Sequence, residues 1–236
     1  MGMQTKFLVP CAVSIAFAMA VGSATHARFT ETDTQRLVFF CELVAAAIAS
    51  LDERATLEIQ ALTDPLTGLA NRRQLRQRLD EELARALRHH RPLSVAMLDV
   101  DNLKQINDRG GHDVGDRALV EVASCLRLLA RAEDTIGRRG GDEFMWILPD
   151  TDREDALAAV ERARAMIATQ VVHAGPTTVS AGIADTEGAT DASGLMRLAD
   201  VALYWSKTHG RDQARVYQGE EVRVLSSPEQ ADPAHP

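Results

Sequence analysis

Five consecutive residues constrain the fold of this chain most strongly: Gly140-Gly141-Asp142-Glu143-Phe144. Strand-like residues flank them at 135–138 and 144–148, so the two glycines fall where the chain must reverse between paired strands. Glycines leave the backbone open to a close ligand, and the two acids that follow could hold a metal. The stretch therefore predicts a β-hairpin and indicates a nucleotide-processing enzyme.

Length, charge and cysteine content narrow the class of protein. With 236 residues and 45% hydrophobic content the chain can bury a core, which excludes disorder of the whole chain. A net charge of -8 argues against a broad basic surface for a nucleic acid polymer, so any phosphate site must be local and suits small polyphosphates. Cys11, Cys41 and Cys125 have neither disulfide nor zinc spacing, and we expect a cytoplasmic protein.

The amino-terminal segment 1–33 allows three interpretations. Residues 7–24 are nearly all apolar and just long enough for a membrane span or a signal peptide. Export is the least favoured, because it would separate the later acids from cytosolic nucleoside triphosphates. An anchor, interrupted by Pro10, would place the protein at the inner membrane with its catalytic domain in the cytoplasm. We favour a strand at 11–24 that, with the turn and helix after it, resembles the C-terminal end of a GAF sensor domain.

A helical stalk is predicted from 34 to 62. Apolar residues recur there in alternating steps of four and three, with one break at Glu58, as in the seam of a coiled coil. These residues are Leu37, Cys41, Val44, Ile48, Leu51, Ala55 and Leu62. We therefore expect a homodimer; the alternative is an amphipathic helix that packs on its own chain.

A compact α/β domain is predicted from 63 to 217. The residues 64–68, DPLTG, have the chemistry of a turn that ends the stalk. Apolar spacing predicts helices at 75–87, 119–129, 152–169 and 193–208, and strands at 93–98, 135–138, 144–148 and 177–184. The polar segment 218–236, which contains prolines, is predicted to be a disordered tail.

Two groups of acids could form one metal site. Asp99 and Asp101 follow the buried strand predicted at 93–98, and a carboxylate at a strand end is well placed to hold Mg²⁺ against a phosphate oxygen. Asp142 and Glu143, on the neighbouring hairpin, could close the same site. The alternative is that Asp99 or Asp101 merely caps the helix that follows.

Two further segments carry ligand chemistry. The segment 102–116 mixes a lysine, an amide, glycines and acids, and is predicted to be a ligand-lining loop. Within it Asn107 and Asp116 could read the donors and acceptors of guanine, although Asp116 could also simply favour a helix N-terminus. Lys207 and Arg211, four residues apart near a helix end, could bind a triphosphate or be solvated surface charges.

Arg131 and Asp134 form a third candidate ligand site. An arginine can grip a guanine edge or a phosphate with two hydrogen bonds while an aspartate accepts guanine protons. The alternative is an ion pair on the surface.

Four blocks of the sequence resemble the GGDEF family of diguanylate cyclases in order and spacing. They are DPLTGLANR at 64–72, LDVDNLKQINDRGGHDVGD at 98–116, RRGGDEF at 138–144 and ALYWSKTHGRDQA at 202–214. The resemblance implies a fold like that of class III nucleotidyl cyclases and polymerase palm domains, with a central, mostly antiparallel five-stranded sheet flanked by helices. It also implies condensation of two GTP into cyclic di-GMP and two pyrophosphates, between the facing half-sites of a homodimer.

The resemblance gives roles to individual residues. Asp99, Asp142 and the Val100 carbonyl match the ligands of two Mg²⁺ ions, and Asp142, or Glu143, would deprotonate the ribose 3′-hydroxyl. Lys104, Lys207 and Arg211 match the triphosphate-binding cations, Asn107 and Asp116 match the guanine readers, and Gly140 and Gly141 match the backbone beside the substrate. Arg131 and Asp134 match the RxxD site of product inhibition.

Some positions depart from the family pattern. Asn102 and Leu103 replace a pair that is often bulky or aromatic, Arg139 replaces an aromatic or aliphatic residue, and Asp212 replaces an asparagine. These changes affect pocket packing and turnover rather than the chemical groups. The alternative function is a catalytically silent domain that senses cyclic di-GMP or GTP, but no acid that catalysis needs is lost.

Overall fold

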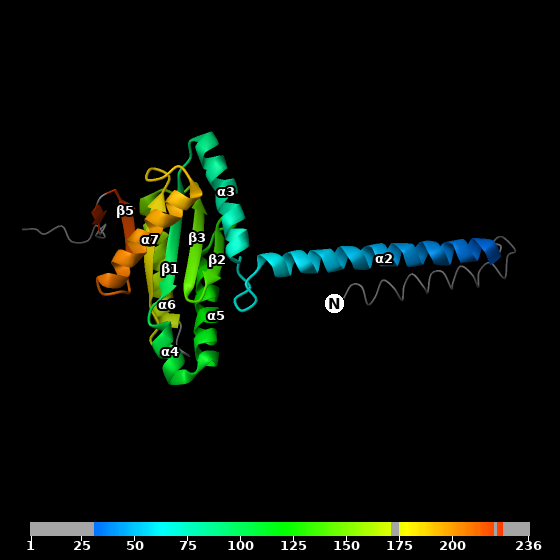
Figure 1. Ribbon diagram of the computed structural model, residues 1–236, viewed down its shortest axis with the longest axis horizontal. Coiled ribbons are helices and arrows are strands. Elements are labelled where there is room, and N and C mark those ends of the chain that lie inside the picture. The colour runs from blue at the N-terminus through cyan, green and yellow to red at the C-terminus, as the bar shows by residue number, and fades with distance from the viewer. Residues whose placement is uncertain (1–30, 171–174, 220, 224–236) are drawn as a thin grey trace, which may run out of the picture. The chain divides into compact units, whose positions relative to one another are not determined.

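The computed structural model describes residues 31–170, 175–219 and 221–223. The chain divides into two units, residues 1–61 and 62–236. Helix α2 (Glu31–Leu62) is the element described in the first unit, and the second holds the sheet and the remaining helices (Figure 1). The predictions for residues 7–24 lie outside the described residues. Among the helices that are described, none combines the length and apolar character needed to cross a membrane.

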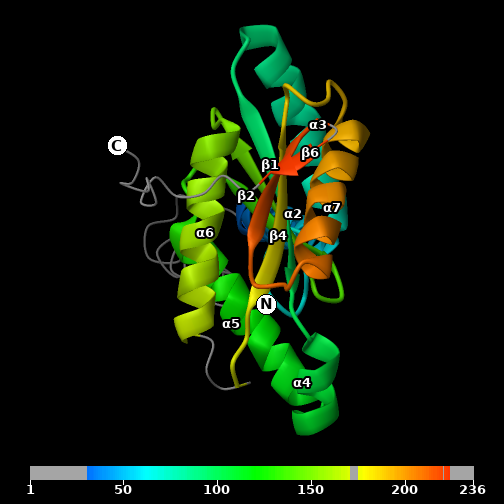
Figure 2. The same cartoon turned by 90° about the vertical axis from the view of Figure 1, so that its left-hand side faces the viewer.

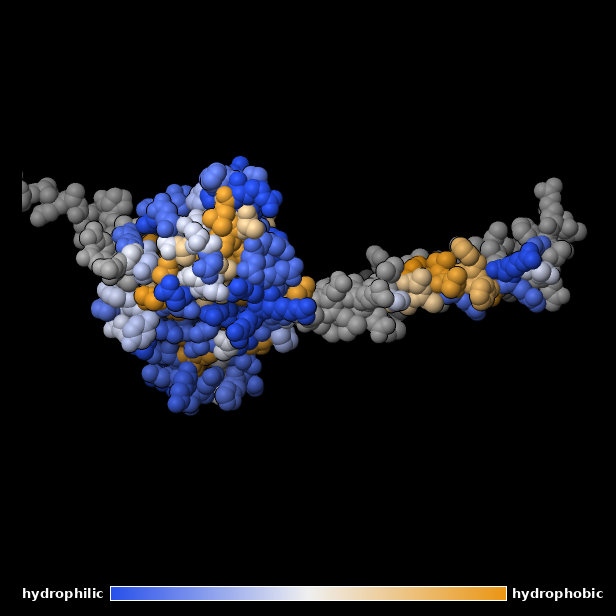
Figure 3. Space-filling model, turned by 45° about the horizontal axis from the view of Figure 1, so that its top comes forward, coloured by the Kyte–Doolittle hydropathy of each residue, from blue (hydrophilic) through white to orange (hydrophobic). Residues whose placement is uncertain are grey.

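Helix α2 carries an exposed apolar surface. Its exposed large apolar side chains are Val38, Phe39, Phe40, Leu43 and Val44, with exposures from 39% to 67%. Figure 3 shows apolar side chains gathered along one stretch of this helix. Cys41 and Ile48, which belong to the predicted seam, are partly buried. Exposed apolar groups of this size are typical of contact sites, so α2 is suited to a partner, while the homodimer itself stays a prediction.

A six-stranded sheet forms the centre of the second unit. In spatial order its strands are β2 (Thr135–Gly140), β3 (Glu143–Pro149), β1 (Leu93–Val100), β4 (Val179–Asp185), β5 (Ala214–Gln218) and β6 (Glu221–Arg223). Neighbouring strands are antiparallel except for β4 and β5, which are parallel. The predicted fold class, a mostly antiparallel sheet flanked by helices, is therefore confirmed, with the short β6 added to the five strands expected.

Helices cover both faces of the sheet. Figure 2 shows the sheet between α6 on one side and α3 and α7 on the other. The helices are α3 (Arg72–His89), α5 (His112–Leu129), α6 (Arg153–Gln170) and α7 (Ala192–Thr208). Strand β1 is buried along its whole length, with Ala96 and Leu98 in the core of α5 and α6, and Val95 and Met97 in the core of α3 and α7. Because side chains alternate along a strand, a strand buried on both faces is mostly apolar, and in β1 only Ser94 and Asp99 are polar.

The segment 102–116 differs from the loop that we predicted. It forms helix α4 (Leu103–Gly110), a turn at Gly111 with φ 82°, and the start of α5. Helix α4 has eight residues, of which Ile106 is buried and Leu103 packs against the core, so it is too short to repeat the apolar spacing by which a helix is recognised.

The segment 218–236 also differs from the prediction at its start. Residues 221–223 pair with β5 as strand β6, although a wholly disordered tail was expected there. The reason is that the open edge of β5 offers unpaired backbone groups, which a following segment can satisfy whatever its composition. The residues after 223 lie outside the described part of the chain.

Candidate active site

The sheet brings the two predicted groups of acids together at one end. Strands β1 and β3 are antiparallel neighbours, and Asp99 lies opposite Glu143 in their register. The Val100 N–H donates a hydrogen bond to the Asp142 carbonyl at 3.1 Å, which joins the end of β1 to the turn between β2 and β3. The three acids Asp99, Asp142 and Glu143 therefore belong to a single region of the domain.

The turn between β2 and β3 requires its two glycines. Gly140 has φ 147° and Gly141 has φ 58°, which side chains of L residues rarely adopt. No described atom lies within 4 Å of a Cβ built at either position, so the backbone beside Asp142 is open. Arg138 donates to the Gly141 carbonyl from Nε at 2.9 Å and from Nη2 at 2.7 Å, and its Nη1 lies 3.3 Å from Asp64 Oδ1. Arg138 thus fixes the turn to the start of the domain.

Asp99 is a buried carboxylate that a lysine neutralises. Lys207 Nζ lies 2.6 Å from Asp99 Oδ2. Burial raises the pKa of Asp99 to about 6; Lys207 opposes this rise, and the negative charges of Asp142 and Asp101 add to it. At neutral pH the carboxylate is therefore mostly ionised, and its burial gives it a strong need for a positive partner.

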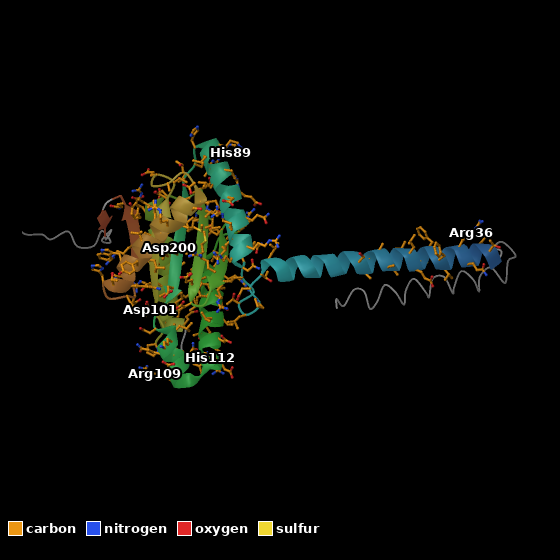
Figure 4. The ribbon with its side chains drawn as sticks, in the orientation of Figure 1. Arg36, His89, Asp101, Arg109, His112 and Asp200 are labelled. Atoms are coloured by element: carbon orange, nitrogen blue, oxygen red, sulfur yellow. The ribbon has the colours of Figure 1, made fainter. Side chains whose placement is uncertain are left out.

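Asp101 is a structural residue rather than an open ligand. Its carboxylate accepts hydrogen bonds from Thr178 Oγ1 and Ser180 Oγ, both at 2.7 Å, and from the Asp212 N–H at 3.1 Å. Figure 4 labels it beyond the end of β1. The alternative in which one of these acids caps the next helix is wrong, because Asn102 is the N-cap residue of α4. Asp101 instead ties β1 to β4 and to the segment after α7.

The predicted guanine readers lie on consecutive helices. Asn107 belongs to α4 and is partly buried, whereas Asp116 belongs to α5 and is exposed, as is Lys104 on α4. Oδ1 of Asn107 is buried and has no hydrogen-bond partner within the described ranges. A buried acceptor without a partner is rare in folded proteins, so this amide is a candidate for contact with a ligand.

The two predicted triphosphate cations do not share a helix. Lys207 lies in the last turn of α7, which ends at Thr208. Arg211 lies beyond the helix with φ 62°, and its N–H donates to the Ser206 carbonyl at 3.0 Å. Lys207 and Arg211 therefore lie on either side of the helix end, and their joint binding of a triphosphate stays a prediction.

The second unit also matches known proteins. The family described as "Diguanylate cyclase, GGDEF domain" matches residues 61–213. This chain belongs to the GGDEF family.

Relatives and solved structures within the GGDEF family agree with this assignment. The chain is 44% identical over 161 residues to the diguanylate cyclase DgcP of Pseudomonas aeruginosa, which covers 66% of this chain and 24% of DgcP. It is 40% identical over 159 residues to the response regulator PleD of Caulobacter vibrioides, covering 64% of this chain and 35% of PleD. The structure of the coiled coil and GGDEF domain of DgcB from Caulobacter crescentus, in complex with c-di-GMP, is similar with a TM-score of 0.70 and 28% identity, over 76% of this chain and 97% of that one. The chain thus spans well under half the length of DgcP and PleD.

Arg139, which we predicted to depart from the GGDEF family pattern, places a positive charge beside the signature. Its Nη1 lies 3.7 Å from Glu143 Oε2 and 3.5 Å from Asp200 Oδ1. Burial raises the pKa of Asp200, Arg139 opposes this, and the charge of Glu143 adds to it. Sequence reasoning misses Asp200, which Figure 4 labels on α7. Asp200 precedes Lys207 by seven residues, which is two turns of the same helix. This spacing places both residues on one side of α7 and could have indicated Asp200 from the sequence.

Arg131 and Asp134, the predicted site of product inhibition, lie between α5 and β2. Asp134 Oδ2 accepts hydrogen bonds from the Arg131 backbone N–H and from Trp146 Nε1, both at 3.0 Å. Oδ1 of Asp134 is buried and, in the described part of the chain, has no hydrogen-bond partner, while Arg131 is exposed. Trp146, on β3, is a further residue that sequence reasoning misses, because its indole meets Asp134 only once the strand is paired.

Proposed function

We propose that this chain is a diguanylate cyclase, which condenses two GTP into cyclic di-GMP and releases two pyrophosphates. The observation that carries the proposal is the buried Asp99 carboxylate, which lies opposite Glu143 in the β1–β3 register and contacts Lys207. Acid and cation are the two kinds of group that nucleotidyl transfer needs, one for a metal and one for phosphate.

The donor set fits Mg²⁺, and we propose two ions per active site. Asp99, Asp142 and the Val100 carbonyl would supply hard oxygen ligands of the type that Mg²⁺ prefers. Within the described residues no three acid, histidine or cysteine side chains form a ready metal cluster. This fits Mg²⁺, which usually takes one or two carboxylates and completes its shell with water and substrate phosphates. When bound, the ions would neutralise phosphate charge and polarise the reacting phosphorus centre.

The remaining roles concern substrate placement. Asn107 and Asp116 would hold the guanine, and Gly140 and Gly141 would let the nucleotide approach the backbone. Lys104, Lys207 and Arg211 would bind the triphosphate and offset its charge. These contacts would align the reacting groups, which is the main contribution of the protein in phosphoryl transfer.

The chemical step would involve two facing copies. The ribose 3′-oxygen of one GTP would attack the α-phosphorus of the other, its proton passing to Asp142 or Glu143, while the bond to pyrophosphate breaks. Repeating the step in the opposite direction closes the ring. Since each copy would hold one GTP, a homodimer is required, and the exposed apolar side chains of α2 support the view that the stalk assembles it.

Product inhibition would act through Arg131 and Asp134. The guanidinium of Arg131 is exposed and suits a guanine edge or a phosphate of cyclic di-GMP. Asp134 is held by two hydrogen bonds, so its carboxylate is already oriented before the product arrives.

The test is a product assay with matched variants. Purified protein incubated with GTP and Mg²⁺ should yield cyclic di-GMP, identified by mass, and Asp142→Ala should lower the rate by roughly a thousandfold with an unchanged melting temperature. Asp80→Ala removes an exposed acid of α3 that has no role in the proposed site, and serves as the control. A wild-type protein that binds cyclic di-GMP yet never forms it would instead support the silent sensor.

The stalk is tested separately. Removing residues 1–60 should weaken dimerisation and lower activity at micromolar protein, with recovery at higher concentration. Undiminished activity of the shortened chain would remove the proposed role of α2.

A further inference from the structure

Gly115 occupies a position where its backbone does not require glycine. It lies in the first turn of α5, is buried, and does not adopt a positive φ. Alanine would suit a helical backbone of this kind better, because glycine loses more conformational freedom in a helix than any other residue. The reason for glycine must therefore be a contact.

That contact is with the side chain of Asn107. A Cβ built on Gly115 would lie 1.9 Å from Asn107 Oδ1, 2.9 Å from its Cγ and 3.4 Å from its Nδ2. The first of these distances is far below any van der Waals contact, so the carboxamide of Asn107 rests directly on the bare Cα of Gly115. The same Oδ1 is buried and lacks a hydrogen-bond partner in the described structure.

We infer that Gly115 is a specificity-determining residue of the guanine site, because its missing side chain leaves the space that the Asn107 carboxamide needs. The inference rests on the proposed function. Held against α5, the amide lies beside the residue that precedes Asp116, so the two guanine readers are placed by one turn of helix. An amide and a carboxylate held at a fixed distance from each other can distinguish guanine from adenine. Adenine lacks the N1–H and the 2-amino group, which in guanine can donate hydrogen bonds to a carboxylate.

Any side chain at 115 must then displace the amide. The backbone of α4 holds Asn107 through the hydrogen bond from the Gly111 N–H to the Asn107 carbonyl, 2.8 Å, so the side chain itself has to rotate away. A purely structural role for Gly115, in which it only lets α4 and α5 approach, would affect stability but not the choice of base. The two roles therefore differ in a measurable way.

A double-mutant cycle separates them. The variants are Gly115→Ala, Asn107→Ala and the pair together, and the ligand is 3′-deoxy-GTP with Mg²⁺, which cannot react because it lacks the attacking hydroxyl. Binding is measured by calorimetry on the full chain, beside 3′-deoxy-ATP. We expect Gly115→Ala to weaken 3′-deoxy-GTP binding about tenfold, roughly the loss of one good hydrogen bond, and to reduce the preference for guanine. In the Asn107→Ala background the same change should cost less than about twofold.

Gly110→Ala is the matched control. A Cβ at Gly110 would lie 2.7 Å from Val114 Cγ2, so it strains the same pair of helices without meeting the amide. It should lower the melting temperature and leave base preference unchanged. Equal losses of affinity for Gly110→Ala and Gly115→Ala, or a loss at Gly115 that persists in full when Asn107 is alanine, would overturn the inference.

Two other outcomes are also decisive. If Gly115→Ala alone does not fold, the double variant must recover its melting temperature, since alanine at 107 removes the group that the Cβ strikes; a double variant as unstable as the single one would refute the inference. If the wild-type chain binds no guanine nucleotide at all, the proposed function fails first, which the wild-type titration shows by itself.

Discussion

Lys207 Nζ and Asp99 Oδ2 lie 2.6 Å apart, so a group proposed to bind phosphate rests on a group proposed to bind metal. Lys207 comes from α7 and Asp99 from β1, and the lysine supplies the positive charge that a buried carboxylate needs. When metal and triphosphate bind, Asp99 would gain the metal as its counterion and Lys207 would gain a phosphate. The ion pair between them would therefore be replaced by these new contacts. The protonation of Asp99 should therefore influence both activity and stability.

Cyclase activity should fall in acid, because Mg²⁺ binds the ionised form of Asp99. The pKa of this carboxyl is about 6, and below that value the ionised fraction falls about tenfold per pH unit. We expect the Mg²⁺ concentration for half-maximal rate to rise about fivefold from pH 6 to pH 5, approaching tenfold per unit only at lower pH, and to change little from pH 7 to pH 8. Mg²⁺ titrations at each pH, corrected for protonation of GTP, measure this. A requirement that is flat across the acid range would contradict the assignment of Asp99.

The stability of the metal-free protein should depend on the same group with the opposite sign. Because the pKa of Asp99 is raised from 3.8 to about 6 on folding, the folded state binds the proton more tightly than the unfolded state. This contribution is complete below about pH 4 and is lost as the pH rises through about 6. Asp99→Asn cannot ionise, so it should gain stability relative to the wild type across that window. Urea midpoints in EDTA measure the difference, which would be independent of pH if Asp99 ionised equally in both states.

Much of the fold could be predicted because helices and strands that pack on a core carry apolar residues at regular spacing in the sequence. Strand β1 is buried on both faces and reads as an apolar run, while α3 shows leucines at helical spacing. The turn of the β2–β3 hairpin is marked by Gly140 and Gly141, whose φ values demand glycine. Helix α4 could not be predicted in this way, because its apolar face consists of Leu103 and Ile106 alone, and two residues do not establish a period.

The candidate site was predictable only where adjacency follows from strand ends. Asp99 and Glu143 lie opposite each other because β1 and β3 pair, and the apolar runs of both strands could be recognised in the sequence. The contacts of Lys207 with Asp99 and of Arg139 with Asp200 depend on how α7 packs on the sheet. Such packing is set by many apolar contacts at once, so the spacing of the charged residues alone does not reveal it.

The ion pair between Asp64 and Arg138 should stabilise the domain. Their side chains are 17% and 14% exposed, and Asp64 Oδ1 also accepts hydrogen bonds from the Thr67 N–H at 2.9 Å and Oγ1 at 2.7 Å. Asp64→Ala leaves a partly buried guanidinium without its partner, so we expect a loss of about 2–4 kcal/mol in the free energy of unfolding. Asp80→Ala, which breaks an exposed pair, should cost less than about 1 kcal/mol. Urea unfolding of both variants decides the point, and equal losses would contradict it.

Product inhibition should depend on Trp146 as well as on the RxxD residues. The Trp146 indole donates to Asp134 Oδ2 at 3.0 Å, and the Arg131 N–H donates to the same oxygen. Arg131→Ala removes the exposed guanidinium and should relieve inhibition by cyclic di-GMP without loss of stability. Trp146→Phe keeps an aromatic ring but deletes the donor, so Asp134 is less firmly oriented and the inhibition constant should rise about fivefold to tenfold.

The control for both variants is Glu133→Ala, an exposed neighbour in the same loop, which should leave inhibition unchanged. Initial rates measured before product accumulates distinguish relief of inhibition from a change in turnover, and they should stay within about twofold of the wild type. If inhibition persisted in Arg131→Ala, the RxxD residues would have no role in product inhibition in this chain. If Arg131→Ala relieved it and Trp146→Phe did not, the Asp134 carboxylate would be held well enough by the backbone of its own loop.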